Sequence, residues 1–435
     1  MKIRILTAGA ATLLVALGLV GCTSASSENV SAEETTITYW ATDQGAGNAG
    51  AMEILAPEIA KFEEQTGINV KVEVSPWSDL TPNTLTAAVS GQGPDVLDIG
   101  NTNAVTFQST GAFYEFDDEA LQALGGKDRF VDAAFATTAK EGEIGTSVPL
   151  YSQVYALYYN KEMLADAGIE PPATWEELVS AAKTLTKPDS NQYGVVFPGG
   201  TVNSSMHVSF ILSEQNGGSA FDDDGNPTFT SQGMVDGVKQ YVDLLSEHHV
   251  MNPIVAEYTD AGQAAGDFAR GDAAMFIAQA VSAKVLGEYG MDPSAWGIVP
   301  IPAPEGGEQV GSHVAGTNMS IFSYSKNIDA ALEFVKFMTS DEEQEILSGG
   351  FKLLPAVKGA TATLTDDQEK LDVWTEILAD HARPLPLVPS VQAFQTNVGG
   401  AVVQLIARAA TGKVITEDDV RTALEDAQQK MGATD

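Results

Sequence analysis

Hydrophobic and polar positions after residue 35 follow two periods that alternate along the chain. The predicted elements come in the order strand 36–40, helix 51–66, strand 68–74, helix 80–90 and strand 95–99. The strands are rich in β-branched residues or alternate in polarity, whereas the first helix has apolar positions three to four residues apart and ends at Gly67. This alternation of strands and helices predicts an α/β lobe with a largely parallel sheet.

Further along the chain, capping residues mark the starts of later helices. Residues 155–160 (YALYYN) predict another strand. Thr174 and Glu177 have the spacing of a capping box, and Ser340 and Glu343 repeat it. In such a box the two side chains satisfy free backbone N–H groups of the first helical turn, so we expect a helix after each pair.

Two irregular stretches interrupt these elements. Residues 221–230 contain an Asp-Gly turn and predict a hairpin. A calcium loop beginning at Asp222 is the alternative, but Pro227 stands at the position of the loop glycine and Gly233 at that of the bidentate Glu. Residues 296–304 (WGIVPIPAP) carry three prolines and predict an extended crossover between two lobes.

The first 22 residues have the pattern of an export signal. Lys2 and Arg4 precede an apolar run over residues 5–20, and Leu-Val-Gly then leads into Cys22. This ending resembles a bacterial lipobox, which implies that residues 1–21 are a lipoprotein signal peptide and that Cys22 is lipid-modified. A transmembrane anchor is the alternative, but a run of 16 apolar residues is shorter than the roughly 20 that span a bilayer.

The residues after the signal predict a tether. Residues 22–35 are polar, Ser-rich and without periodicity, which is typical of a flexible linker. Two acyl chains on Cys22 would suffice for stable anchoring, so we expect an extracytoplasmic, cell-membrane lipid-anchored protein. Cys22 is the only cysteine, so no disulfide is predicted.

Composition limits the class of protein further. Of the 435 residues, 44% are hydrophobic, and the mature chain of about 410 residues is long enough for two lobes. The formal net charge of −36 argues against nucleic acid or an anionic membrane face as a partner. The sequence contains no phosphate-binding loop, no hydrolase nucleophile elbow and no metal-ligand spacing, so neither a cofactor, a metal nor catalysis is predicted.

Several blocks occur in the order and spacing of a known family. They are 62–70 (FEEQTGINV), 91–96 (GQGPDV), 156–164 (ALYYNKEML), 174–178 (TWEEL), 268–275 (FARGDAAM) and 325–337. Together they resemble the extracellular solute-binding lipoproteins of ABC importers for carbohydrates, the group that includes maltose-binding protein. The resemblance covers nearly all of residues 36–432.

This resemblance implies an α/β, two-lobed periplasmic-binding-protein-like fold of type II, with a hinge and an interlobe ligand cleft. The N-terminal lobe would comprise 36–148 plus 305–345, and the C-terminal lobe 149–304 plus 346–435. A monomer would bind an extracellular mono- or oligosaccharide, close by hinge motion and deliver the sugar to the ABC permease subunits in the membrane. Binding energy would then drive closure, so the resemblance implies no enzyme.

Loop positions and the family arrangement imply a set of ligand-binding residues. They are Trp40, Asp43, Trp77, Asp98, Asn101, Asn103, Tyr151, Gln153, Asn203, His207, Gln279, His313, Asn318, Arg383 and Gln395. Two positions depart from the family, because Gln279 and Gln395 stand where relatives often carry aromatic residues. The departures suggest a smaller or more polar sugar than a maltodextrin, or aromatic platforms supplied by Trp77 or Trp296.

Three other interpretations stay open at this point. The protein could be a lipid-anchored enzyme acting on glycans, or an adhesin or receptor accessory whose cleft never closes. Within the binding interpretation, the solute could be a compound other than a sugar, such as glycerol-phosphate or a polyamine.

Overall fold

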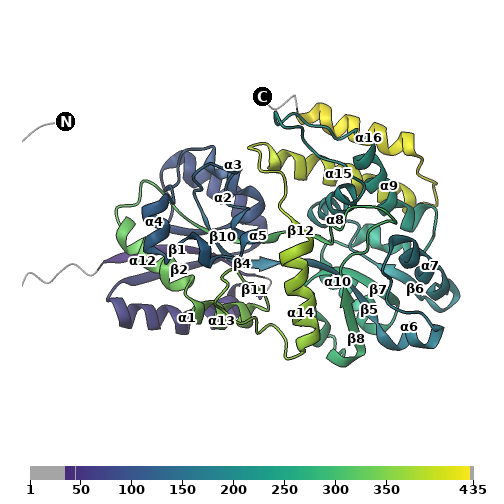
Figure 1. The fold of residues 1–435 in the computed structure, drawn as a ribbon, viewed down its shortest axis with the longest axis horizontal. Helices are drawn as coiled ribbons and strands as arrows, with labels where there is room; N and C mark the ends of the chain where they lie inside the picture. The colour runs from purple at the N-terminus through teal and green to yellow at the C-terminus, as the bar shows by residue number, and fades with distance from the viewer. Residues whose placement is uncertain (1–34, 45, 432–435) are drawn as a thin grey trace, which may run out of the picture. The chain divides into compact units, whose positions relative to one another are not determined.

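The strand Val96–Gly100 (β3) is buried along almost its whole length, as expected for a strand with neighbours on both sides. In the computed structural model, which describes residues 35–44 and 46–431, β3 lies inside a six-stranded sheet (Figure 1). The order across this sheet is β11 (Leu354–Pro355), β4 (Val148–Gln153), β10 (Ala315–Ile321), β3, β1 (Thr36–Thr42) and β2 (Asn69–Ser75). β1 runs parallel to β2 and β3, and β10 is antiparallel to β3 and β4. The carboxyl ends of β1 to β4 therefore meet the start of β10 at one edge.

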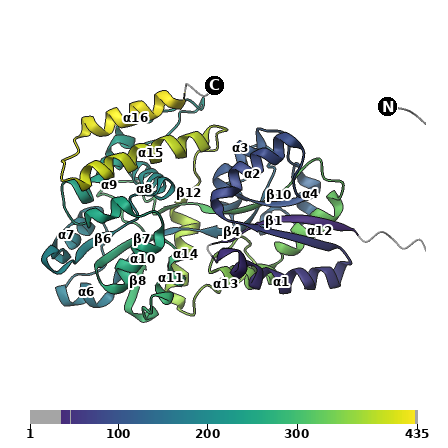
Figure 2. The same ribbon diagram turned by 180° about the vertical axis from the view of Figure 1, so that it is seen from behind.

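Helices cover both faces of this first sheet. One face packs against α1 (Gly47–Thr66), α4 (Asp118–Ala123), α12 (Ile328–Met338) and α13 (Asp341–Phe351), and the other against α2 (Trp77–Ser90) and α3 (Ala104–Gln108). Figures 1 and 2 agree in placing α1 and α13 on the side opposite to α2 and α3. The predicted stop of the first helix is confirmed, because Gly67 caps α1 with a left-handed φ of 71°.

The second lobe is built on a four-stranded sheet. Its order is β6 (Tyr193–Val196), β7 (Ala273–Gln279), β5 (Tyr155–Asn160) and β8 (Trp296–Val299). The surrounding helices are α6 (Lys161–Ala167), α7 (Trp175–Leu185), α8 (Val202–Gln215), α9 (Gln232–Ser246), α10 (Ala261–Arg270), α11 (Ser282–Glu288), α14 (Gln368–Glu376), α15 (Val391–Ala410) and α16 (Glu417–Met431). A short parallel ladder joins β9 (Ser312–His313) to β12 (Ala382–Arg383). A short helix, α5 (Asp132–Phe135), precedes β4 along the chain.

The crossover predicted for residues 296–304 begins later than expected. Trp296 starts β8 and is 3% exposed, with its ring 5.2 Å from that of Tyr158. It belongs to the core of the second lobe, so its indole does not reach a ligand site between the lobes.

The lobe boundaries also differ from the sequence-based ones. Residues 149–153 and 346–357 were expected in the second lobe, but they lie in the first sheet and its core. The reason is that β10 returns to the first sheet and pairs with both β3 and β4, which keeps β4 there until Gln153.

The predicted capping devices are present, although one is incomplete. Before α7, Thr174 and Glu177 form the full capping box. Before α13, Ser340 accepts a hydrogen bond from the N–H of Glu343, but the Glu343 carboxylate lies 2.6 Å from Lys61 Nζ of α1. The second pair therefore starts a helix and also ties it to α1.

The Asp-Gly stretch forms a turn with a single β-bridge. Phe221 and Pro227 make that bridge, and Asp222 Oδ1 accepts hydrogen bonds from the N–H groups of Asp224 and Asn226. The Asp222 carboxylate is thus used to hold the turn.

Candidate ligand site at the strand ends

Three side-chain amides gather at the edge where the strands of the first sheet end. Asn101 follows β3 and donates from Nδ2 to the carbonyl of Val314, at 3.0 Å. Gln153 ends β4 and pairs with Ala315 at the start of β10. Gln44 follows β1 and donates from Nε2 to the hydroxyl of Thr317 on β10, at 2.9 Å. We call Gln44, Asn101 and Gln153 the amide set.

The amide oxygens of this set share an unusual property. Each is buried, and none accepts a hydrogen bond from any residue in the described part of the chain. A buried polar atom without a partner lowers stability by about 1–3 kcal/mol unless something else satisfies it. Such atoms, grouped at one sheet edge, are therefore suited to accept hydrogen bonds from a bound molecule.

Gln44 is the member that the sequence analysis missed. The residue is 4% exposed and has a φ of +47°, a left-handed conformation that costs a non-glycine residue roughly 1 kcal/mol or more. The same strand-end argument that selected its neighbour Asp43 would have reached it. Asp43 is partly buried and donates its backbone N–H to the carbonyl of Ser75.

Trp77 stands beside this set at the first residue of α2. A methyl group built on Gly100 would lie 3.6 Å from the indole of Trp77, so the ring is placed next to the residue that precedes Asn101. The side chain is 40% exposed, which leaves part of its ring surface open. An open aromatic face beside polar groups is suited to stack on the C–H face of a sugar ring.

Three aromatic residues lie together beside the β9 segment. The Tyr155 hydroxyl lies 3.1 Å from His207 Nδ1, and the rings of His207 and His313 are 4.1 Å apart. Tyr155 also donates its backbone N–H to Ser312 Oγ, which ties β5 to β9 at 2.8 Å. We call Tyr155, His207 and His313 the imidazole cluster.

Burial keeps both histidines of this cluster neutral. It lowers the pKa of His207 to about 4, and it lowers the pKa of His313 well below the ordinary value because the ring has no exposed surface. Neither ring nitrogen of His313 has a hydrogen-bond partner among the described residues.

Further contacts join the two lobes near these groups. Gln395 of α15 donates from Nε2 to Asn103 Oδ1 at 3.1 Å, and both side chains are buried. Thr106 of α3 donates its hydroxyl to the carbonyl of Pro389 at 2.8 Å. Asn103 and Gln395, two predicted ligand residues, are therefore partners of each other.

Other predicted residues lie inside the first lobe. Asp98 is 1% exposed and accepts hydrogen bonds from the Tyr39 hydroxyl at 2.7 Å and from the N–H of Thr42 at 3.0 Å. Burial raises the pKa of this carboxyl to about 7. Tyr151 packs against Phe351.

Two more members of the predicted set lie away from the amide set. Asn318 is buried and donates to the hydroxyl of Ser147. Trp40 donates from Nε1 to Glu73 and lines a groove of about 570 Å³ that Gly93 and Tyr324 also line.

Three predicted residues lie on the second lobe or its ladder. Asn203 is exposed near the start of α8. Gln279 ends β7 opposite Tyr155, and its carbonyl accepts a hydrogen bond from the Tyr158 hydroxyl. Arg383 pairs with His313 in the β9–β12 ladder, and its side chain is exposed.

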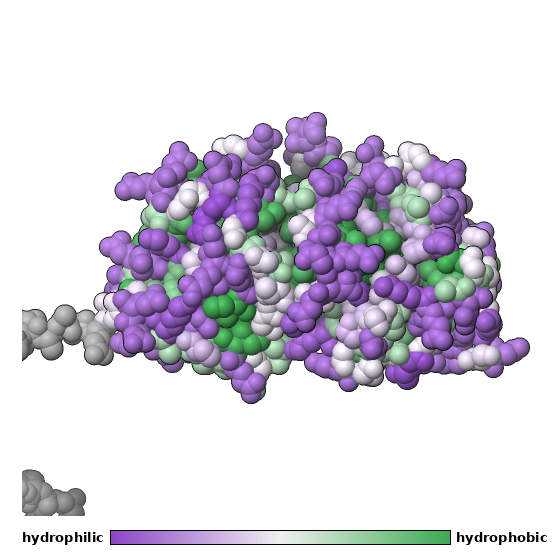
Figure 3. Space-filling view, turned by 60° about the horizontal axis from the view of Figure 1, so that its bottom comes forward, coloured by the Kyte–Doolittle hydropathy of each residue, from purple (hydrophilic) through white to green (hydrophobic). Residues whose placement is uncertain are grey.

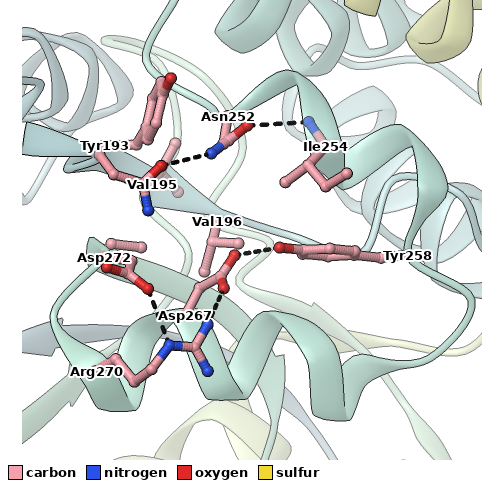
Figure 4. A pocket seen from close by; sticks show the side chains of 11 residues that line it. Tyr193, Val195, Val196, Asn252, Ile254, Tyr258, Asp267, Arg270 and Asp272 are labelled. Carbon is pink, nitrogen blue, oxygen red and sulfur yellow. Dashed lines mark hydrogen bonds and ion pairs between the residues drawn. The ribbon is translucent and has the colours of Figure 1, made fainter. Parts of the chain in front are cut away.

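A separate cavity of about 130 Å³ lies within the second lobe, away from the strand ends described above. Figure 4 shows Tyr258, Asp267, Arg270 and Asp272 joined in one chain of interactions along its wall. Arg270 forms ion pairs with the carboxylates of both Asp267 and Asp272, so its positive charge is compensated within this wall.

The surface fits the strongly acidic composition. Figure 3 shows a face on which hydrophilic residues predominate and hydrophobic residues occur in small groups. Over residues 35–44 and 46–431, no three His, Cys, Asp or Glu side chains gather as a metal site. Within the same ranges, no helix has the length and apolarity needed to span a membrane. Cys22 and the predicted signal lie outside the described residues.

Comparison with known proteins decides the family. A model of the family "bacterial extracellular solute-binding protein" matches residues 45–345. The chain belongs to this family. The resemblance seen in its sequence blocks is thereby confirmed, and the family is one of binding proteins.

Among relatives of this solute-binding protein is the diacetylchitobiose binding protein DasA of Streptomyces coelicolor, 26% identical over 325 residues, covering 74% of this chain and 73% of the relative. Another is an arabinooligosaccharide-binding protein of Bacillus subtilis, 24% identical over 367 residues, covering 83% and 79%.

Solved structures show the same fold. An ABC transporter solute-binding protein from Thermotoga lettingae, bound with α-D-tagatose, superposes with a TM-score of 0.75 at 23% identity, covering 92% of this chain and all of that one. The predicted fold, a two-lobed α/β fold of the type II periplasmic-binding-protein kind, is confirmed.

Proposed function

We propose that this solute-binding protein captures an extracellular mono- or oligosaccharide between its lobes and delivers it to the permease of an ABC importer. The observation that carries the proposal is the amide set beside Trp77, which combines buried hydrogen-bond acceptors with an open aromatic face. Amides and aromatic faces are the groups with which proteins hold sugar hydroxyls and the apolar faces of sugar rings.

The names of the relatives point the same way. Two proteins similar to most of this chain are named as binders of sugar oligomers. The contacts from Asn101 to Val314 and from Tyr155 to Ser312 lie where the chain returns from one lobe to the other. A ligand at this edge could therefore shift the hinge between an open and a closed arrangement.

The proposal includes a place in the cell and a mode of action. Cys22 would carry the lipid anchor, residues 22–35 would tether a monomeric two-lobed body outside the membrane, and no bond would be broken in the ligand. Cys22→Ser is expected to move the protein from the membrane fraction to the medium or the periplasm. Retention in the membrane fraction would contradict the anchor.

Thermal unfolding of residues 29–435 with a panel of mono- and oligosaccharides tests the binding function. Ligand at 1,000 times its Kd adds about 4 kcal/mol to the free energy of unfolding. For a chain of this length that corresponds to a rise in Tm of about 5 °C. A panel in which no carbohydrate shifts the Tm would count against sugar binding and leave the fold unaffected.

A further inference from the structure

The cavity of about 130 Å³ in the second lobe has no part in the proposed function. Val196 ends β6 and Ala273 starts β7, and both line the cavity from the sheet. β7 has seven residues and ends at Gln279, which pairs with Tyr155 of the imidazole cluster. At about 3.3 Å per residue, the start of β7 lies roughly 20 Å from that cluster. The cavity is therefore at the outer end of the lobe.

One wall of this cavity is apolar. It consists of Val195, Val196, Ala273 and Ile254. The first three side chains are buried, whereas Ile254 is 41% exposed and so lies at the opening to solvent. An apolar cavity of about 150 Å³ can hold benzene, so this slightly smaller cavity has room for about five non-hydrogen atoms. We call these four residues the apolar wall.

The polar part of the lining accepts hydrogen bonds. Tyr258 donates its only hydroxyl proton to Asp267, and Arg270 donates to both Asp267 and Asp272 (Figure 4). Each carboxylate oxygen has two lone pairs, so the two aspartates can accept further hydrogen bonds. A ligand that donates hydrogen bonds therefore suits this side of the cavity.

The charges of the lining favour a positive ligand. Asp267 and Asp272 contribute two carboxylates and Arg270 one guanidinium, so one negative charge is left over. Asp267 is 9% exposed, and burial raises its pKa although Tyr258 and Arg270 lower it. Its partners thus stabilise the carboxylate less than water would, and a cation can supply the difference. The formal charge of −36 also attracts cations to the protein.

We propose that this cavity binds a small primary alkylammonium ion, whose ammonium group donates to Asp267 and Asp272 while its alkyl group packs against the apolar wall. An ammonium group has three donors and no acceptor, which matches the acceptors of the lining. Tyr193 and Tyr258 also line the cavity, and aromatic rings attract cations. The site is separate from the sugar site and does not depend on the proposed function.

Methyl NMR titration of the full chain at pH 7 with matched compounds tests this site. Isobutylammonium, isobutanol and isobutyrate share one carbon skeleton and carry a positive, a neutral and a negative group. We expect isobutylammonium to shift the methyl resonances of Val195, Val196 and Ile254 and to bind about tenfold more tightly than isobutanol. Isobutyrate should bind more weakly than either. Equal affinities for isobutylammonium and isobutanol, or shifts confined to methyl groups elsewhere, would overturn the proposal.

Substitution of Asp272 tests the role of the charge. Asp272→Asn keeps the shape of the side chain and removes the surplus negative charge, while Asp267 keeps its contacts with Tyr258 and Arg270. We expect isobutylammonium to bind this variant about tenfold more weakly, with an affinity close to that of isobutanol.

Asp166→Asn is the matched control, because it removes the same charge from an exposed position of α6 in the same lobe. Its affinity for isobutylammonium should equal that of the wild type. The Tm of each ligand-free variant shows whether the fold is retained. Wild-type affinity in a folded Asp272→Asn variant, or an equal loss in Asp166→Asn, would show that these carboxylates do not hold the ammonium group.

Discussion

The amide set of the first lobe and the imidazole cluster of the second lobe present polar groups in two different ways. Asn101 and Gln44 are anchored by hydrogen bonds at one end, and the oxygen at the other end has no protein partner in the described chain. His207 and His313 are instead held by ring packing, with 4.1 Å between ring centres. The amides are thus fixed by hydrogen bonds and keep an oxygen without a protein partner, whereas the two imidazole rings are neutral and fixed by packing against each other.

The largest expected effect comes from placing a charge in each region. His313→Lys would bury an ammonium group with no exposed surface and no negative partner, so we expect the free energy of unfolding to fall by about 3–5 kcal/mol. Gln153→Lys, at the partly exposed end of β4, should cost about 1 kcal/mol or less. Urea unfolding of both variants measures the difference. Equal losses would mean that the two regions are equally desolvated.

A smaller effect is expected from pH. The pKa of His207 is about 4 in the folded protein and near 6.5 when unfolded, so the unfolded chain takes up the proton first. Its contribution to stability is therefore complete above pH 6.5 and is lost as the pH falls toward 4. Since the side chain is only partly buried, we expect a contribution of roughly 2 kcal/mol.

The His207→Gln variant isolates this contribution. Wild type and variant share Asp98, whose raised pKa changes stability with pH in the opposite direction. The free energy of unfolding of the wild type minus that of the variant therefore changes between pH 7 and pH 4 only because of the histidine. Urea unfolding at both pH values gives that difference. If the free energies of unfolding of wild type and variant changed equally with pH, His207 would have the same pKa in the folded and the unfolded chain.

The smallest effect concerns a contact that joins the lobes. Gln395→Met removes the donor to Asn103 Oδ1 and leaves that buried oxygen without a partner, which should lower the free energy of unfolding by about 1–2 kcal/mol. A double-mutant cycle with Asn103→Ala measures the coupling. Strictly additive losses would show that the bond contributes nothing to the joining of the lobes.

Local signals in the sequence predicted much of the fold. Gly67 ends α1 and Thr174 caps α7 because these devices act through neighbouring residues. The lobe boundary was misplaced because β4 is kept in the first sheet by β10, a strand that lies far away in the sequence. A pairing between strands so far apart in the sequence, such as that of β10 with β4, cannot be predicted from local patterns.

The candidate site was predictable only in part, for the same reason. Asn101 could be selected because it follows a strand that was recognisable in the sequence, and Gln153 because of its place in the family arrangement. Gln44 follows the same strand as Asp43, so the strand-end argument could have included it, but its residue type does not indicate the left-handed backbone that it adopts. The hydrogen bond between Asn103 and Gln395 depends on how the lobes contact each other, which the positions of strand ends in the sequence do not predict.

The position of β10 has a consequence for the order of events during synthesis. This strand fills the space between β3 and β4, yet it begins at Ala315, 162 residues after β4 ends at Gln153 (315 − 153). At roughly 5–20 residues per second, the first sheet would wait about 8–30 s for its missing strand. During that time β4 and the β1–β3 group are separate fragments with open edges. The two parts of this sheet can therefore join only after Ile321 has been made, and the edge strand β11 is added later still.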